Sequence, residues 1–386
     1  MRYSAIEMIE KLVGFPTVSR DSNLDLIEFV REYLAEYGVE SHVVPNPEGT
    51  KGNLYATVGP AVEGGVVLSG HTDVVPVDGQ PWDTDPFAVT ERDGRLYGRG
   101  TCDMKSFSAC GLALVPEMLA AGLKRPIHFA LSYDEEVGCQ GAPSMIAELV
   151  EHLPAPRAVI VGEPSDMRLV NAHKGISGFE TVVTGHEAHS SQTHRGVSAV
   201  MNAARLIHFI DEMARECASH PRPESGFVPP YTTIHVGMVK GGTAGNIISR
   251  ECRFVWDLRN MPDDDPQSYL ERFEAYCRDE VLPEMRKVAP EADIVTRGHY
   301  RTPGLRAEPG SAADALVRAL TGDNDTGVVS YGTEAGQFQE AGFSTIVCGP
   351  GSIDQAHQPN EFIERSQVDL CMKTLRRLIA LQAAGA

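Results

Sequence analysis

The chain has 386 residues, which is enough for two domains of ordinary size. Apolar residues make up 42% and charged residues 23%, a composition typical of a globular protein with a sizeable core. The 34 Lys and Arg against 53 Asp and Glu give a net charge of −19. We therefore expect no nucleic-acid partner and no membrane-surface partner, because phosphate groups would be repelled. A cation cofactor or an amine-bearing substrate is compatible with this charge.

Three further features indicate the cellular setting. No apolar run approaches the ~20 residues that a membrane span requires. The eight cysteines are spread along the chain without a C-x-x-C pair, as is typical of reduced thiols in a cytosol. The apolar spacing within residues 1–13 predicts an amphipathic helix and not a signal peptide. We expect a cytoplasmic α/β enzyme.

Strands and helices alternate in the first half of the chain and again near its C-terminus. The β-branched runs predict buried strands at 66–69, 127–132, 158–161 and 344–348. Helical spacing predicts helices at 106–123, 142–153, 312–320 and 366–383. This alternation predicts an α/β fold with a mixed, largely parallel sheet flanked by helices.

The middle of the chain has a different pattern. Its predicted elements, in order, are a strand at 179–184, a helix at 197–217, strands at 232–239 and 250–258, a helix at 266–286 and a strand at 292–297. The order β-α-β-β-α-β is that of a ferredoxin-like α+β unit. We therefore expect an inserted domain at 176–298, between two parts of a catalytic domain at 1–175 and 299–386.

Side chains that bind metals follow the predicted parallel strands. They are His71, Asp73, Glu135, Glu136, Glu163 and His357, with Asp103 in a Gly-rich stretch before a helix. Because sites in open parallel sheets lie at the carboxyl ends of the strands, we expect these side chains to converge. Two histidines with several carboxylates favour Zn²⁺. Cys102 beside Asp103 is a possible soft ligand, but we favour a packing role for it.

The chemistry of neighbouring residues suggests separate roles. In His71-x-Asp73 the carboxylate can lie behind the ring and orient it. Glu135 and Glu136 are adjacent and cannot point the same way on an extended segment, so one can bind metal while the other acts as a base.

These segments resemble the dinuclear zinc aminoacylase and carboxypeptidase family. The matching stretches are SGHTDVVPV (69–77), GRGTCDMK (98–105), SYDEEVGCQGA (132–142), VGEPS (161–165), AHSS (188–191), GGTAGNIIS (241–249) and WDLRNMP (256–262). The resemblance implies a zinc-peptidase-like catalytic domain, two Zn²⁺ per subunit with Co²⁺ as a substitute, and hydrolysis of a small N-acyl amino acid. Residues 331–342 and 348–361 resemble the branch that removes the acetyl group from N2-acetyl-L-ornithine in arginine biosynthesis.

The resemblance also implies a role for each metal-site residue. His71 and Glu163 would bind one zinc ion, Glu136 and His357 the other, and Asp103 would bridge the two. Glu135 would be the general base, and Asp73 the partner that orients His71.

For the inserted domain, the resemblance implies residues that contact the substrate. His189 would stabilise the oxyanion, often from the partner subunit of a homodimer formed through this domain. Asn246 and Arg259 would hold the substrate carboxylate. The alternatives are helix capping for His189, and for Arg259 a salt bridge with Asp257 or Glu251. Glu334 could meet the ornithine ammonium or be a surface-loop carboxylate.

Three alternative functions are a hydrolase with another substrate, a catalytically silent binding protein and a nucleotide-binding protein. One is a relative with another substrate, such as succinyl-diaminopimelate desuccinylase or a dipeptidase, which a few lining residues would distinguish. A catalytically silent binding protein would have no need of the base Glu135. A nucleotide-binding protein would need a Gly-rich fingerprint between a strand and a helix, and the GGTAG stretch at 241–245 precedes a predicted strand.

Overall fold

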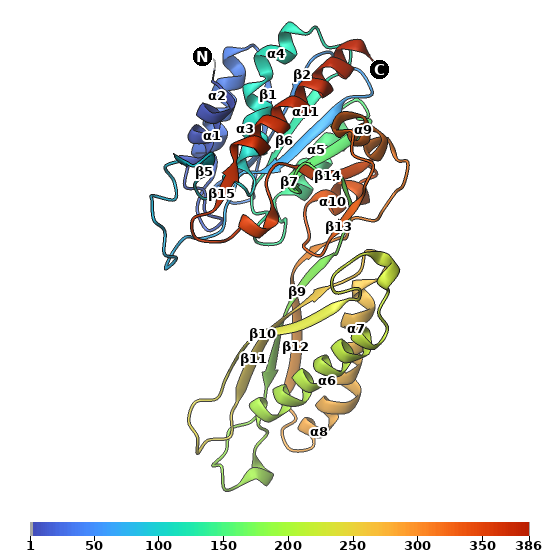
Figure 1. The fold of residues 1–386 in the computed structure, drawn as a ribbon. Coiled ribbons are helices and arrows are strands. Elements are labelled where there is room, and N and C mark those ends of the chain that lie inside the picture. The colour runs from blue at the N-terminus through green and yellow to red at the C-terminus, as the bar shows by residue number, and fades with distance from the viewer. Residues whose placement is uncertain (1–2, 386) are drawn as a thin grey trace. The chain divides into compact units, whose positions relative to one another are not determined.

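The computed structural model describes residues 3–385 and divides the chain into two compact units (Figure 1). Unit 1 contains the chain up to Ala172, Leu305–Val328, and the chain from Thr333 onward. Unit 2 contains His173–Gly304 and Val329–Gly332. The expected boundaries of the inserted domain were 176 and 298. Unit 2 ends later because its last strand continues to Thr302.

Unit 1 is built on an eight-stranded sheet with the order β1-β2-β6-β3-β7-β14-β8-β13. The four neighbouring strands β6 (Ile127–Ser132), β3 (Val66–His71), β7 (Ala158–Pro164) and β14 (Thr345–Gly349) are parallel and buried throughout. Antiparallel pairing attaches β1 (Ser41–Pro45), β2 (Gly52–Val58) and β8 (Val170–His173), and β13 (Gly327–Val329) completes the order. The predicted mixed, largely parallel sheet is confirmed.

Helices cover both faces of this sheet. One group consists of α1 (Ala5–Val13), α2 (Leu24–Glu36), α3 (Lys105–Ala113), α4 (Val115–Ala120), α9 (Ala312–Thr321) and α11 (Arg365–Ala384). The other consists of α5 (Ala142–His152) and α10 (Ala335–Glu340), which contact each other. Successive side chains of β3 point to opposite faces of the sheet, so neighbouring residues meet different helix groups. A Cβ at Gly70 would meet Ser108 of α3. Ser69 on the other face hydrogen-bonds Glu334, which lies beside α10.

Shorter elements complete unit 1. A small antiparallel sheet has the order β15-β5-β4, formed by Phe362–Glu364, Arg95–Tyr97 and Thr90–Arg92. A 3₁₀ helix lies at Ile353–Gln355. None of the helices within residues 3–385 has the length and apolar character needed to cross a membrane.

Unit 2 is an antiparallel sheet in the order β10-β11-β9-β12 with helices packed on it. Its elements are β9 (Ile176–Thr184), α6 (Ala199–Ser219), β10 (Thr233–Gly241), β11 (Glu251–Arg259), α7 (Pro266–Tyr276), a π-helical turn (Cys277–Val281), α8 (Leu282–Arg286) and β12 (Asp293–Thr302), with 3₁₀ turns at Thr193–Arg195 and Pro223–Ser225. The core is centred on Phe254, Trp256 and Phe273. This chain order and strand order are those of the predicted ferredoxin-like unit.

Candidate metal centre

The parallel strands of unit 1 deliver a group of acidic and histidine side chains to one edge of the sheet. His71 is the last residue of β3, and Glu163 is the next-to-last residue of β7. Glu135 and Glu136 follow β6, and His357 follows β14 after the 3₁₀ turn. Asp103 precedes α3. These six predicted residues come from segments that are far apart in the sequence.

Asp103 is the geometric centre of this group. Its Oδ1 lies 3.1 Å from Nε2 of His71, and its Oδ2 lies 3.2 Å from Nε2 of His357. The same Nε2 of His357 also lies 2.9 Å from Oε2 of Glu136. The same Nε2 of His71 also lies 3.7 Å from Oε1 of Glu163. One carboxylate therefore stands between two histidine–glutamate pairs.

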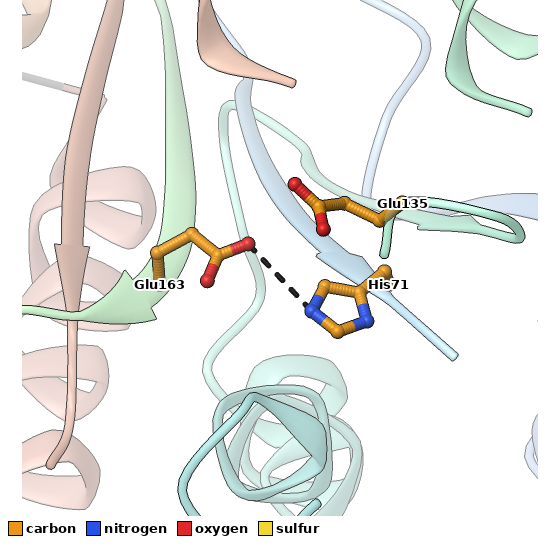
Figure 2. Close-up of side chains that lie close together, drawn as sticks. All are labelled: His71, Glu135 and Glu163. Carbon is orange, nitrogen blue, oxygen red and sulfur yellow. Dashed lines mark ion pairs between the residues drawn. The ribbon is translucent and has the colours of Figure 1, made fainter. Parts of the chain in front are cut away.

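The side chains of His71, Glu135 and Glu163 point toward one another, with the His71–Glu163 ion pair drawn as a dashed line (Figure 2). The donor atoms of these three residues lie within 4.8 Å of one another, as do those of His71, Asp103 and Glu136. Oε1 of Glu163 is buried and, within residues 3–385, receives no hydrogen bond. A buried carboxylate oxygen without a donor requires a compensating positive charge, so this donor set fits a metal ion.

Burial and mutual repulsion raise the pKa of the glutamates in this group. Burial, followed by the charges of neighbouring carboxylates, raises the pKa of Glu135 to about 8 and that of Glu136 to about 7. The same causes raise the pKa of Glu163. Such a concentration of carboxyl groups is typical of a site that cations neutralise.

The carboxylates of the group shift the pKa values of the two histidines, and the histidines in turn shift the pKa of Asp103. Hydrogen bonds to Asp103 and Glu136 raise the pKa of His357 to about 10. For His71, burial lowers the pKa, but Asp103 and the neighbouring glutamates outweigh it and the net shift is upward. Burial would raise the pKa of Asp103, but the two histidines outweigh it and the net shift is downward. The carboxylates around both histidines thus favour the charged form of each ring.

Asp73 contacts more of the site than the sequence predicts. Nδ1 of His71 lies 2.9 Å from the backbone oxygen of Asp73 and 3.6 Å from its carboxylate. The carboxylate accepts hydrogen bonds from the hydroxyl of Ser19 and from the backbone N–H groups of Glu135 and Glu136. Asp73 therefore fixes both the ring of His71 and the segment that carries the two glutamates.

Cys139 is a contact of the site that the sequence analysis did not identify. Its buried thiol donates to Oε1 of Glu135 across 3.2 Å. The signal was present in the stretch SYDEEVGCQGA, where Cys139 follows Glu135 by four residues, but a lone thiol has no distinctive pattern. Cys102, which we expected to pack rather than bind metal, is buried and donates to the backbone oxygen of Ser352.

Glu334 is not in a surface loop, which was one of its two expected positions. Only 1% of its surface is exposed, so it is not a surface-loop carboxylate. Its Oε1 accepts from the Ser69 hydroxyl at 2.5 Å, and its Oε2 accepts from the Ser132 hydroxyl at 2.7 Å. Both oxygens are thus bound to strands β3 and β6. The expected contact with a substrate ammonium stays a prediction.

In unit 2, the structure brings two of the three predicted substrate-binding residues together. His189 pairs with Ile247 in an isolated β-bridge, and the backbone N–H of Ser190 donates to the backbone oxygen of Asn246. His189 Nδ1 lies 2.8 Å from the Ser191 hydroxyl, within the segment rather than at a helix end. Arg259 ends β11 and lies 3.4 Å from Asp257, the salt bridge considered as its alternative.

The comparisons with known proteins agree with this site. The model of peptidase family M20/M25/M40 matches residues 67–381. The chain is 33% identical over 390 residues to an acetylornithine deacetylase of Pasteurella multocida, covering 99% of each chain. It is 36% identical over 382 residues to an acetylornithine deacetylase of Myxococcus xanthus, covering 98% of this chain and 97% of the relative.

A solved structure shares the fold. The family M20 metallo-carboxypeptidase Sso-CP2 of Sulfolobus solfataricus aligns with a TM-score of 0.78 at 18% identity, covering 99% of this chain and 100% of the other. The chain belongs to peptidase family M20/M25/M40. Together with the histidine and carboxylate cluster, this membership defines the protein as a metal-dependent hydrolase that acts on amide bonds.

Proposed function

We propose that this hydrolase removes the acetyl group from N2-acetyl-L-ornithine to give L-ornithine and acetate, a step of arginine biosynthesis. The observation that carries the proposal is the position of Asp103 between two histidine–glutamate pairs, in a chain similar over its full length to acetylornithine deacetylases. A net charge of −19 also suits a substrate that bears an ammonium group.

The proposed site holds two divalent ions. His71 and Glu163 would bind one, Glu136 and His357 the other, and Asp103 both, with Zn²⁺ as the native metal and Co²⁺ as a substitute. When bound ~3.5–4 Å apart, two such ions polarise a carbonyl and lower the pKa of water. Oε1 of Glu163 is buried and receives no hydrogen bond within residues 3–385, which supports its assignment as a ligand.

Glu135 is the proposed general base. Burial raises the pKa of the Glu135 carboxyl group, which makes it a stronger proton acceptor than a free glutamate. Glu135 would take the proton of the attacking water and deliver it to the leaving amine. The hydrogen bond from Cys139 occupies Oε1, which leaves Oε2 for this transfer.

The substrate contacts proposed for unit 2 require two chains. Arg259 lies at the end of the sheet where the chain enters and leaves the unit, and His189 and Asn246 follow the opposite end. The nine residues of β11 between these ends span roughly 30 Å, which is longer than an N-acyl amino acid. We therefore infer that Arg259 of one subunit and His189 and Asn246 of the partner bind the same substrate.

The surface of unit 2 supports a homodimer formed through this domain. Strand β10 is at the edge of its sheet, and its Met238 and Val239 are 67% and 57% exposed. Met201 on α6, which packs against β10, is 67% exposed. Exposed apolar side chains on and beside an edge strand are typical of an interface. The eight free thiols support a cytoplasmic location.

The test combines metal content with substrate preference. The purified protein is analysed by mass spectrometry for metals and assayed for amine release from N-acetylornithine, N-acetylmethionine, N-succinyl-diaminopimelate and a dipeptide. Asp103→Asn serves as the control for site-dependent turnover. Near two metals per chain and N-acetylornithine as the preferred substrate would support the proposal. Preference for another compound would reassign the substrate, and metal-free, inactive protein would indicate a catalytically silent relative.

A further inference from the structure

A buried ion pair next to the metal centre has no part in the chemistry above. Glu361 lies at the end of the stretch CGPGSIDQAHQPNE, and Arg99 lies in GRGTCDMK. Nη1 of Arg99 is 2.6 Å from Oε2 of Glu361, and the two side chains are 1% and 0% exposed. Removing two charges from water is costly, so their burial beside the site calls for an explanation.

Glu361 binds the backbone of the loop that carries Asp103. Its Oε1 accepts hydrogen bonds from the backbone N–H groups of Gly100, Cys102 and Asp103, at 3.0, 2.8 and 3.1 Å. Its own backbone oxygen accepts from the N–H of Gly98. The loop can converge on one carboxylate because Gly100 adopts φ +85°, which favours glycine. Glu361 therefore fixes the backbone directly at Asp103.

Arg99 extends the same network to His357. Its Nη2 donates to Oε1 of Gln80 at 2.7 Å, and Nε2 of Gln80 donates to the backbone oxygen of His357 at 3.0 Å. The indole N–H of Trp82 also donates to Oε1 of Gln80, and the guanidinium lies 5.2 Å from the Trp82 ring centroid. His357 has φ +63°, an uncommon conformation that such a contact helps to hold.

We propose that Glu361 and Arg99 are positioning residues that set the distance between Asp103 and His357. Both residues act on backbone: Glu361 on the N–H of Asp103, and Arg99 on the oxygen of His357 through Gln80. The inference rests on the proposed dinuclear site, in which Asp103 and His357 bind the same ion. Groups that orient metal ligands raise metal affinity without touching the metal.

The test measures zinc affinity by chelator competition and the visible spectrum of the Co²⁺-loaded protein. The first variant is Glu361→Gln, which keeps the shape of the side chain. Both oxygens of Glu361 accept hydrogen bonds, but a glutamine has only one oxygen. Its NH₂ group must therefore face either the three backbone N–H groups or Arg99, which are themselves donors. Arg99 also loses the negative charge that balances its own. We expect zinc affinity to fall about 10- to 100-fold and the Co²⁺ spectrum to change.

The matched control is Asp264→Asn in unit 2. Asp264 accepts two hydrogen bonds from Arg222, both at 2.7 Å, and one from Thr232. The control breaks another arginine–carboxylate pair, which is less buried than Arg99–Glu361 and involves none of the residues proposed to bind metal. It is expected to lower the Tm while leaving zinc affinity and the Co²⁺ spectrum unchanged.

A second variant, Gln80→Leu, guards against failure of Glu361→Gln to fold, because it leaves the Glu361–Arg99 pair intact. It removes the link to His357 together with the hydrogen bonds that Gln80 accepts from Arg99 and Trp82. We expect it to lower zinc affinity less than Glu361→Gln and to change the Co²⁺ spectrum. Parent-like zinc affinity and spectrum in the variants that fold would overturn the inference, even with a lowered Tm. Fewer than two zinc ions in the parent would instead overturn the dinuclear site on which the inference rests.

Discussion

Glu135 and Glu136 are neighbours in the chain, but their side chains have different partners. Glu136 contacts His357, whereas Glu135 receives the thiol of Cys139. Their backbone N–H groups both donate to the Asp73 carboxylate, which holds the segment in one conformation. Two chemically identical residues are thereby placed in two environments, as a division between ligand and base requires.

This division predicts opposite effects of two matched substitutions. Glu135→Ala should retain two metal ions and lose about 10²- to 10⁴-fold in kcat, because it removes the base and no ligand. Glu136→Ala should lose one metal ion together with activity. Metal analysis and steady-state kinetics on both variants provide the check. Metal loss from Glu135→Ala would reverse the two assignments.

Substitution of Arg259 tests whether this residue binds the substrate carboxylate. Arg259→Ala should raise KM strongly for substrates with a free α-carboxylate and much less for their amidated analogues, because a guanidinium pairs with a planar carboxylate. Comparing kcat/KM for the two substrate forms measures the difference. An equal loss on both forms would leave Arg259 with only its salt bridge to Asp257.

From the burial of His128 we predict that folding stability decreases in acid independently of the metal centre. Its ring is 1% exposed, and burial lowers its pKa from 6.5 to about 4. Between these values the unfolded chain binds a proton that the folded chain does not, so stability falls as pH falls from 6.5 to 4.

At 1.36 kcal/mol per pKa unit, the contribution of His128 to this loss is roughly 3 kcal/mol. His128→Gln should remove it, as measured by urea unfolding at a series of pH values. His208→Gln is the matched control, because that ring is 68% exposed on α6. An unchanged pH dependence in His128→Gln would refute the prediction.

At the scale of the elements, the parallel strands were the most predictable feature. β3, β6, β7 and β14 are buried on both faces, so their β-branched runs are continuous and easily recognised. The residues that follow these strands were predictable for the same reason. The neighbouring α2 is absent from the predicted elements, although Leu26, Ile27, Val30 and Leu34 have helical spacing.

Other features depended on tertiary contacts that a single sequence does not encode locally. The helix predicted at 106–123 is divided at Leu114 into α3 and α4, because Pro116 cannot continue a helical hydrogen-bond ladder. Glu334 and Glu361 look like ordinary loop carboxylates in the sequence. Their partners Ser69 and Arg99 lie more than 250 residues away along the chain, so their burial could not be predicted.

The close approach of β7 and α3 gives a prediction at this scale. A Cβ added at Gly162 would lie 2.0 Å from the ring of Phe107. Gly162→Ala should therefore lower the free energy of unfolding by about 1–3 kcal/mol through overpacking. In a Phe107→Ala chain, which lacks the ring atoms that meet this Cβ, Gly162→Ala should cost less, as urea unfolding of the single and double variants would reveal. Strictly additive losses would show that the two residues do not meet.

At the scale of the whole molecule, the length of β11 leads to a prediction about subunits. Suppose that Glu135 and Arg259 of one chain and His189 of its partner act on one substrate. A mixture of Glu135→Ala and His189→Ala chains then contains dimers with one complete site. Random pairing of the coexpressed chains should recover about a quarter of parent activity, although each variant alone is inactive or severely impaired. Recovery no greater than the sum of the separate variants, with dimers present, would place His189 and Glu135 in the same chain.

The position of β14 in the sheet has a consequence for biosynthesis. β14 pairs in parallel with β7, yet unit 2 lies between these strands in the chain. While the ribosome makes residues 176–344, the edge of β7 that β14 will cover stays open, and His357 has not been synthesised. Domains fold as they emerge, so unit 2 can form before the sheet of unit 1 is closed. The proposed metal site can therefore be completed only after His357 has emerged from the ribosome.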